Sequence, residues 1–341
     1  MKTVTLGSTG ITVPQNGFGA LPIQRIDKEA AAHLLRKAYD GGMRFFDTAN
    51  AYSDSEEKMG YALADVRQDI FLATKTGATT PAGMREHIEN SLRMLKTDYV
   101  DILQFHCAPV CYKPDDGTGM YECMEALKQE GKIRHIAITA HKIDVAIEAI
   151  ESGLYETLQY PISYLSTPKE LALIDMCVTH NMGFIGMKGL AGGLLTRSDA
   201  AMAFATQFDN FVPIWGIQRE AELDEWLSYM DNTPVMTDEI KAFIEADKAQ
   251  LGGDFCRSCG YCMPCPQGIQ IFQCARMSQM IRRAPSAAWT TAYWQKEMAR
   301  IDDCLHCGKC AAKCPYELNT PELLRKNLED YRNILEGKTK V

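Results

Sequence analysis

Eight of the 13 cysteines in this 341-residue chain stand in two short runs near its C-terminus. The runs are Cys256-x2-Cys259-x2-Cys262-x2-Cys265-Pro266 and Cys304-x2-Cys307-x2-Cys310-x3-Cys314-Pro315. Four thiols at such short spacing, followed by proline, are typical of a segment that wraps a [4Fe–4S] cluster. The sequence therefore predicts two clusters in a small C-terminal domain.

The two runs resemble those of bacterial ferredoxins, in which the first three cysteines hold one cluster and the fourth ligates the other. This scheme predicts one cluster on Cys256, Cys259, Cys262 and Cys314, and a second on Cys304, Cys307, Cys310 and Cys265. The first run has two residues before its last cysteine where ferredoxins usually have three, so Cys265 departs from the pattern.

Two other uses of these cysteines fit the sequence less well. The N-terminus is not typical of a signal peptide, and thiols stay reduced in the cytosol, so a disulfide framework is not expected. Structural zinc takes two ligands from each Cys-x2-Cys unit, whereas runs of three or four suit a cuboidal cluster better. The remaining cysteines are expected to be small buried hydrophobic side chains, namely Cys107, Cys111, Cys123, Cys177 and Cys274.

Composition and charge narrow the class of protein. A hydrophobic content of 46% and a charged content of 23% are ordinary for a soluble globular protein, and no apolar run approaches a membrane span, so we expect a cytoplasmic protein. The net charge of −8 argues against a nucleic-acid partner. Residues 254–341 nevertheless hold 13 Lys and Arg against 9 Asp and Glu, which would offset a charge of roughly −2 on each cluster. Exposed clusters would favour an anaerobe.

Residues 1 to about 230 alternate between short apolar runs and segments with apolar residues at helical spacing. The predicted strands are Gly17–Ala20, Met43–Thr48, Ile70–Lys75, Tyr99–His106, Ile133–Thr139, Thr157–Pro161, Gly183–Lys188 and Phe211–Gly216. The predicted helices are Lys28–Asp40, Ser55–Ala64, Pro81–Leu95, Gly119–Glu130, Ile143–Ser152, Pro168–His180, Ser198–Phe208 and Arg219–Tyr229.

Eight strands, each followed by a helix, predict an α/β fold of the (β/α)8 TIM-barrel type. A doubly wound sheet is the alternative, but no Gly-x-Gly-x-x-Gly motif opens the first helix. A hairpin of Lys2–Leu6 and Ile11–Pro14 is expected to plug the floor of the barrel. We expect the barrel over residues 1–235, a linker helix within 236–253, and an α-rich, ferredoxin-like dicluster domain over 254–341.

Four polar residues stand at the C-terminal ends of three neighbouring predicted strands, where barrel enzymes carry their chemistry. Asp47 ends the second strand, Tyr52 follows in its loop, Lys75 ends the third strand and His106 ends the fourth. Each alone has a structural explanation, but together they indicate an active site. A phenol with a pKa of about 10 is a poor acid, and we expect Lys75, held by Asp47, to lower that pKa. Tyr52 would then protonate a carbonyl oxygen that His106 orients.

These strand ends resemble those of the aldo/keto reductases. The matching stretches are Phe45-Phe46-Asp47-Thr48-Ala49 with Tyr52, Ala73-Thr74-Lys75, and Leu103-Gln104-Phe105-His106. The resemblance covers residues 1 to about 230, and the tail is similar to the branch of the family with a C-terminal ferredoxin-type domain. It implies a catalytic tetrad of Asp47, Tyr52, Lys75 and His106, with Tyr52 as proton donor, and a nicotinamide cofactor bound without a glycine-rich motif.

The resemblance also implies which residues contact NADP(H) or NAD(H). They are Thr139 and Gln159 near the carboxamide, Met187, Lys188, Gly189 and Leu190 near the pyrophosphate, and Gly216, Gln218, Arg219 and Glu225 around the adenosine. Met187 departs from the family pattern, since many members stack a tyrosine there. Trp215 also departs from the family pattern, because it stands where the family usually has the proline of an Ile-Pro-Gly run. Trp226 stands where an asparagine that binds adenine is common. Arg219 can still bond a 2′-phosphate, which favours NADP.

The predicted function is NAD(P)H-dependent reduction of an aldehyde or ketone, with a small carbonyl substrate and two [4Fe–4S] clusters. An apolar or aromatic carbonyl is expected, because the mouth should be lined by Leu21, Ile23, Tyr52, Tyr112 and Trp215. A hydride carries two electrons and a cluster accepts one, so joining them usually takes a flavin, for which no motif is present. The alternative is an electron-transfer or redox-sensing module, in which the barrel holds a cofactor and the clusters face a protein partner such as a ferredoxin or flavodoxin.

Overall fold

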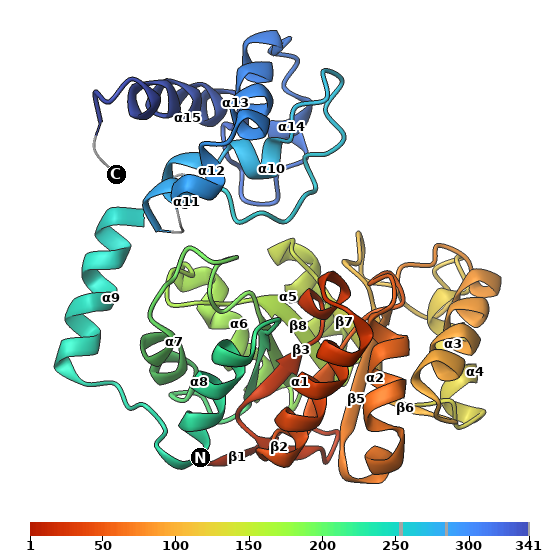
Figure 1. The fold of residues 1–341 in the computed structure, drawn as a ribbon. Coiled ribbons are helices and arrows are strands. Elements are labelled where there is room, and N and C mark those ends of the chain that lie inside the picture. Colours follow the sequence, from red (N-terminus) through yellow and green to blue (C-terminus); the bar gives the residue numbers. More distant parts are fainter. Residues whose placement is uncertain (252–254, 284–285, 340–341) are drawn as a thin grey trace. The chain divides into compact units, whose positions relative to one another are not determined.

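The computed structural model describes residues 1–251, 255–283 and 286–339 (Figure 1). Contacts divide the chain into two compact units. The first unit is Met1–Gly189 with Ser198–Met236, and the second is Leu190–Arg197 with Thr237–Val341. The predicted boundary at residues 253 and 254 lies outside the described residues.

The first unit is a closed barrel of eight parallel strands in the order β10-β3-β4-β5-β6-β7-β8-β9. The predicted barrel is thus confirmed. Each strand lies on the apolar run predicted for it, because parallel strands buried on both faces are nearly continuously apolar. The strands are β3 (Gly17–Gly19), β4 (Phe45–Asp47), β5 (Phe71–Thr76), β6 (Val100–Phe105), β7 (Ile133–Thr139), β8 (Thr157–Pro161), β9 (Gly183–Met187) and β10 (Phe211–Gly216).

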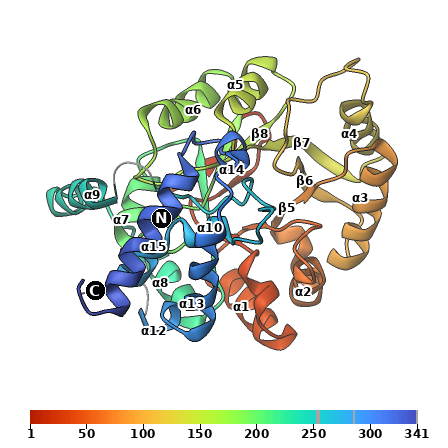
Figure 2. The same cartoon turned by 90° about the horizontal axis from the view of Figure 1, so that it is seen from above.

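Eight helices alternate with the strands and follow one another around them, as Figure 2 shows from above. Their ends carry the expected capping residues: Pro168 begins a helix whose N-cap is Thr167, and Gly153 closes another with φ of 67°. The helices are α1 (Lys28–Asp40), α2 (Ser55–Leu63), α3 (Pro81–Leu95), α4 (Met120–Gln129), α5 (Ile143–Ser152), α6 (Pro168–Thr179), α7 (Ser198–Ala205) and α8 (Glu220–Asp231). Short 3-10 helices precede α1 (η1, Pro22–Arg25) and follow α2 (η2, Ala64–Asp69).

An antiparallel hairpin of β1 (Thr3–Thr5) and β2 (Thr12–Pro14) precedes the barrel. Its apolar side chains, including Val4 and Val13, pack in one buried cluster with Phe45 of β4 and Ile102 of β6. The hairpin thus covers apolar side chains of the barrel strands and keeps water from them, as expected for a plug.

The second unit is helical and has its own core. Its helices are α9 (Asp238–Leu251), α10 (Ile271–Cys274), α11 (Met277–Arg283), α12 (Ser286–Trp289), α13 (Ala292–Ala299), α14 (Lys309–Ala312) and α15 (Thr320–Leu335), with η3 (Arg300–Asp303). Trp289 and Trp294 pack against that core.

The division of the chain differs from the predicted one in two respects. Helix α9, predicted as a linker, belongs to the second unit, where Asp247 pairs with Arg283 at 2.6 Å. Segment 190–197 (Leu190–Arg197) also belongs to the second unit, although it lies between β9 and α7 in the sequence. Its Leu194 carbonyl accepts a hydrogen bond from Arg283 at 3.0 Å. Such contacts between distant residues leave no local pattern in the sequence.

In the part of the chain that the structure describes, no helix combines the length and the apolar character needed to cross a membrane.

Substitution of Gly60 in α2 tests how closely α2 packs against α3. A Cβ atom on Gly60 would lie 2.1 Å from the Met94 carbonyl oxygen and 2.7 Å from the Leu95 carbonyl carbon, both backbone atoms. We therefore expect Gly60→Ala to cost about 1–3 kcal/mol of stability, although alanine favours a helix. A Cβ on Gly77 would meet nothing within 4 Å, so Gly77→Ala is the control. Equal melting temperatures for the two variants would contradict the packing.

Candidate active site and cluster sites

The C-terminal ends of β4, β5 and β6 bring polar side chains into the interior of the barrel. Lys75 donates hydrogen bonds from Nζ to the Asp47 carboxylate and, at 2.6 Å, to the Thr48 carbonyl. The side chains of Lys75 and Asp47 are only 1% and 3% exposed. Two groups that would lose much hydration energy on burial thus satisfy each other.

Two glutamines complete the shell of Asp47. Gln104 of β6 donates from Nε2 to Asp47 Oδ2 at 3.0 Å, and Gln159 of β8 donates to Oδ1 at 3.4 Å. The sequence predicts Gln159 to contact a cofactor and indicates no role for Gln104. One signal in the sequence could have indicated a role for Gln104. It is a polar residue two positions after Ile102, so the alternation of a strand places it on the same face, toward the barrel interior.

Tyr52 and His106 face each other beside this ion pair. Their ring centroids are 5.6 Å apart with an interplanar angle of 80°, and Lys75 Nζ lies 5.1 Å from the centroid of the Tyr52 ring. The structure therefore brings together all four residues of the predicted tetrad.

Burial is the largest single influence on the pKa values of Lys75, Tyr52 and His106. It lowers the pKa of Lys75, but the negative charge of the Asp47 carboxylate opposes it and the net shift is upward, so Lys75 stays charged. Burial raises the pKa of Tyr52, and the Lys75 charge opposes that shift without reversing it. The expected net lowering of the Tyr52 pKa is therefore wrong, although the contribution of Lys75 has the expected sign. Burial and then the Lys75 charge lower the pKa of His106 to about 3, so its ring is neutral at pH 7.

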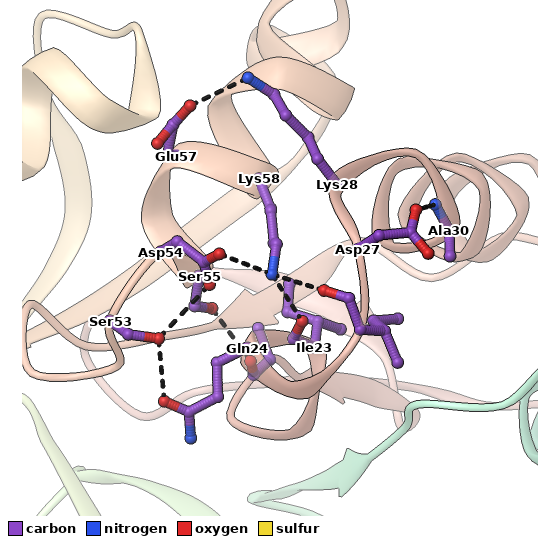
Figure 3. Close-up of polar contacts among 12 residues, drawn as sticks. Ile23, Gln24, Asp27, Lys28, Ala30, Ser53, Asp54, Ser55, Glu57 and Lys58 are labelled. Carbon is purple, nitrogen blue, oxygen red and sulfur yellow. Dashed lines mark hydrogen bonds and ion pairs between the residues drawn. The ribbon is translucent and has the colours of Figure 1, made fainter.

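A buried lysine fixes the segment that follows Tyr52 (Figure 3). Lys58 of α2, only 4% exposed, donates to the carbonyls of Ile23 at 3.1 Å and Ile26 at 2.7 Å. It also pairs with Asp54 at 2.8 Å. These bonds tie η1 to the start of α2 and so restrict where the loop can place the Tyr52 phenol.

The predicted lining of the barrel mouth needs correction. Leu21 is 41% exposed, but Ile23, Tyr112 and Trp215 are buried. Ile23 is the buried residue of η1, and the apolar sequence alone could not distinguish it from an exposed rim residue.

The two residues predicted to contact a cofactor near its carboxamide lie in β7 and β8, and Met187, the first of those predicted near the pyrophosphate, lies in β9. Thr139 is buried and its Oγ1 accepts a hydrogen bond from the Cys107 amide at 2.6 Å. The Oε1 of Gln159 is buried and has no hydrogen-bond partner within the described residues. Met187 ends β9 and packs partly against the barrel interior.

The predicted pyrophosphate stretch is divided between the two units. Lys188 adopts a left-handed φ of 58°, and Gly189 lies so close to Trp215 that a Cβ there would be 2.5 Å from the indole. Both residues belong to the first unit, whereas Leu190 belongs to the second.

The predicted adenosine contacts gather at the start of α8. The Glu222 carboxylate accepts hydrogen bonds at 3.0 Å from the backbone amides of Gln218 and Arg219, capping the helix. The Arg219 side chain is 73% exposed and also pairs with Glu222. Gly216 is exposed, and the Glu225 carboxylate accepts a hydrogen bond from the Ser198 hydroxyl.

Two tryptophans that depart from the family pattern stack on each other. Their ring centroids are 3.9 Å apart at an angle of 8°, and both Trp215 and Trp226 are buried. They thus form part of the packing between β10 and α8 and present no open aromatic face.

In the second unit the eight cysteines of the two runs surround two hollows. One hollow, of about 350 Å³, is lined by Cys256, Cys259, Cys262 and Cys314. The other, of about 420 Å³, is lined by Cys265, Cys304, Cys307 and Cys310, with Cys262 at its edge. The structure thus groups seven of the eight cysteines in the two sets that the ferredoxin pattern predicts, including Cys265 despite its short spacing, while Cys262 lines both hollows. Their roles as ligands stay predictions.

The donor set fits a [4Fe–4S] cluster, which is held by four cysteine thiolates, one on each iron. Burial raises the pKa of Cys262 to about 12, so this thiol needs nearby iron to become a thiolate ligand.

Comparison with known proteins supports both units. Residues 15–209 match the family model described as "Aldo/keto reductase family". The chain belongs to the aldo/keto reductase family. Residues 255–319 match a second model, described as "4Fe-4S dicluster domain", so this aldo/keto reductase carries a C-terminal dicluster domain.

Similar proteins match more than half of the chain. An uncharacterized oxidoreductase, YqkF, of Bacillus subtilis (strain 168) is 27% identical over 224 residues, which are 62% of this chain and 72% of that protein. L-galactose dehydrogenase of Arabidopsis thaliana is 32% identical over 213 residues, 56% of this chain and 66% of that protein. The similarity to oxidoreductases supports an enzyme of this class.

Solved structures show the same fold. The holo form of an aldo-keto reductase from Bacillus halodurans superposes with a TM-score of 0.64 at 24% identity, covering 72% of this chain and 96% of that one. An aldo-keto reductase from Klebsiella pneumoniae in complex with NADPH gives 0.61 at 23% identity, covering 72% and 94%.

The neutral buried His106 makes stability depend on pH. Its pKa of about 3 in the folded state lies below the value of about 6.5 expected after unfolding. The unfolded chain therefore binds more protons between these values, and stability falls as pH drops through this window. Between pH 7 and pH 5, we expect His106 to lower the free energy of unfolding by up to about 2 kcal/mol.

The measurement is the urea midpoint at both pH values for the wild type, His106→Asn and His33→Asn. We expect the loss on acidification to shrink in His106→Asn. The His33 side chain is 61% exposed, so its variant should behave like the wild type. An equal loss in all three proteins would contradict a neutral, buried His106.

Proposed function

We propose that this protein reduces an aldehyde or ketone with a hydride from NAD(P)H, and that Tyr52 donates the proton to the carbonyl oxygen. The observation that carries the proposal is the convergence of Tyr52, Lys75, Asp47 and His106 at the ends of neighbouring strands. Barrel enzymes act at these ends.

The site has features that fit a nicotinamide cofactor. The buried Oε1 of Gln159 lacks a partner among the described residues, and a cofactor carboxamide carries the N–H group that it needs. Thr139 lies on the neighbouring strand, paired with Gln159 in register. Toward the other end of the cofactor, the exposed guanidinium of Arg219 supports NADP over NAD, since it can pair with a 2′-phosphate. When bound, the cofactor would supply the hydride.

The chain's own residues handle the proton. Burial keeps the Tyr52 phenol protonated at neutral pH, so a proton is present to transfer. As the proton leaves, the Lys75 ammonium stabilises the developing phenolate, and Asp47 with Thr48 keeps that ammonium in place. His106, being neutral, can donate an N–H to the same carbonyl oxygen without competing as an acid.

We further propose that the cysteines hold two [4Fe–4S] clusters in the sets that line the two hollows. Such clusters would supply one-electron chemistry. One observation favours the electron-transfer alternative: Cys307 is exposed and its neighbour Leu305 is 62% exposed, so the second cluster would be open to a protein partner of the ferredoxin or flavodoxin type.

Removal of the Tyr52 hydroxyl tests the reductase proposal. We expect Tyr52→Phe to lower turnover of an aromatic aldehyde by at least about 100-fold, because the general acid is lost. NADPH binding, measured by fluorescence titration, should change little. Tyr61→Phe is the control, since Tyr61 is 45% exposed on α2. Unchanged turnover in Tyr52→Phe would contradict the proposal.

The response of the clusters to NADPH separates the two functions. Because a hydride delivers two electrons together and no flavin motif is present, we expect NADPH alone to leave the cluster absorbance oxidised under anaerobic conditions. Dithionite, a one-electron donor, should bleach it. Bleaching by NADPH at a rate matching turnover would instead favour the electron-transfer alternative.

A further inference from the structure

One buried charge in the second unit has no role in the proposed reaction. Arg276, directly before α11, is 2% exposed. Its Nη2 donates to the Gly192 carbonyl at 2.6 Å and lies 2.7 Å from Met280 Sδ, and its Nη1 lies 3.5 Å from the Ala191 carbonyl. Its Nε has no hydrogen-bond partner within the described residues.

Arg276 also differs from Arg282 and Arg283 of α11, because no carboxylate of the described residues forms an ion pair with it. Arg283 pairs with Asp247 and Arg282 pairs with Asp330, both at 2.6 Å. No ion pair between described residues involves Arg276. A buried cation without an anion is strongly unfavourable, so a counter-charge is required.

The chain places Arg276 next to the first hollow. Burial lowers the pKa of Arg276, and Cys256, which lines that hollow, is the group whose negative charge would oppose this shift. Ala275, next to Arg276 in the chain, lines the same hollow as Cys256, Cys259 and Cys314. A [4Fe–4S] cluster with four thiolates there would carry roughly −2, enough to balance the guanidinium.

We propose that Arg276 is the counter-charge of the cluster held by Cys256, Cys259, Cys262 and Cys314, and that it joins this cluster to segment 190–197. The inference rests on the proposed clusters but not on the carbonyl reduction. A fixed positive charge near a cluster stabilises the more negative reduced state and so raises the reduction potential. Because the charge is buried, solvent and salt screen it little.

The tether to segment 190–197 is built for this side chain. Gly192 has a left-handed φ of 67°, and a Cβ there would lie 2.8 Å from Arg276 Nη1. Glycine is therefore the residue that allows the guanidinium to reach the backbone carbonyls. Arg283 holds the same segment through Leu194, but Asp247 already neutralises its charge. Arg276 and Arg283 thus both donate hydrogen bonds to segment 190–197, but only Arg283 has a carboxylate partner among the described residues.

The other hollow offers a contrast. Its cationic lining residue is Lys309, which is exposed, so water and salt screen its charge. Loss of the Arg276 charge should therefore act on one cluster and leave the other nearly unchanged.

The test is an anaerobic redox titration of the full-length holoprotein, followed by electron paramagnetic resonance, after iron and sulfide analysis. The proteins are the wild type, Arg276→Gln, Arg276→Lys and Arg283→Gln. We expect Arg276→Gln to move one of the two midpoints to lower potential, while Arg276→Lys stays near the wild type and Arg283→Gln shifts neither. Hydrogen exchange of segment 190–197 should rise in both glutamine variants, since each loses one tether.

The remaining outcomes are decisive. Unchanged midpoints in a fully loaded Arg276→Gln, or the same shift in Arg283→Gln, would overturn the proposal and leave a structural role. If Arg276→Gln loses about half of its iron, full iron in Arg276→Lys supports the counter-charge, and equal loss in both variants overturns it. A wild type without iron and sulfide would instead refute the clusters themselves, and carbonyl reduction would be untouched by any of these results.

Discussion

A lysine and an aspartate lie side by side inside the barrel with almost no access to solvent, and the active-site geometry depends on that pair. Lys75 and Asp47 come from neighbouring strands, and the Thr48 carbonyl takes a second hydrogen bond from the ammonium. Gln104 and Gln159 donate to the two carboxylate oxygens. Removing one partner of such a pair leaves a buried charge, which costs about 3–5 kcal/mol. The pair therefore fixes the charge beside which Tyr52 and His106 act.

The same environment determines which groups are charged. Burial keeps Tyr52 protonated and His106 neutral, and it leaves Lys75 as the cation of the tetrad because Asp47 compensates it. A phenol that stays protonated until a developing oxyanion takes its proton is suited to reduction of a carbonyl. Burial acts in the same way in the second unit, where it raises the pKa of Cys262 and lowers that of Arg276. The clusters that we propose would supply iron to the thiols and negative charge to the guanidinium.

Much of this organisation was predictable from sequence. The eight strands are apolar on both faces, so each gives a clear local signal, and the tetrad residues follow directly from the strand ends. The two sets of cysteines followed from the resemblance of the two runs to those of bacterial ferredoxins. What could not be predicted depends on contacts between distant residues: the role of Gln104, the burial of Ile23 in η1, the net direction of the Tyr52 pKa shift, and the packing of segment 190–197 with the second unit. The sequence does not distinguish Arg276 from other basic residues, because only the structure shows that no described carboxylate pairs with it.

The most direct test of the account follows the hydrogen that NADPH gives up. The protein would be incubated anaerobically with benzaldehyde and NADPH deuterated at both C4 positions, and the alcohol analysed by mass spectrometry. Direct hydride transfer beside Tyr52 predicts one deuterium on the carbinol carbon of every product molecule. Electrons routed one at a time through the clusters would be joined by solvent protons, and product alcohol without deuterium would contradict the account.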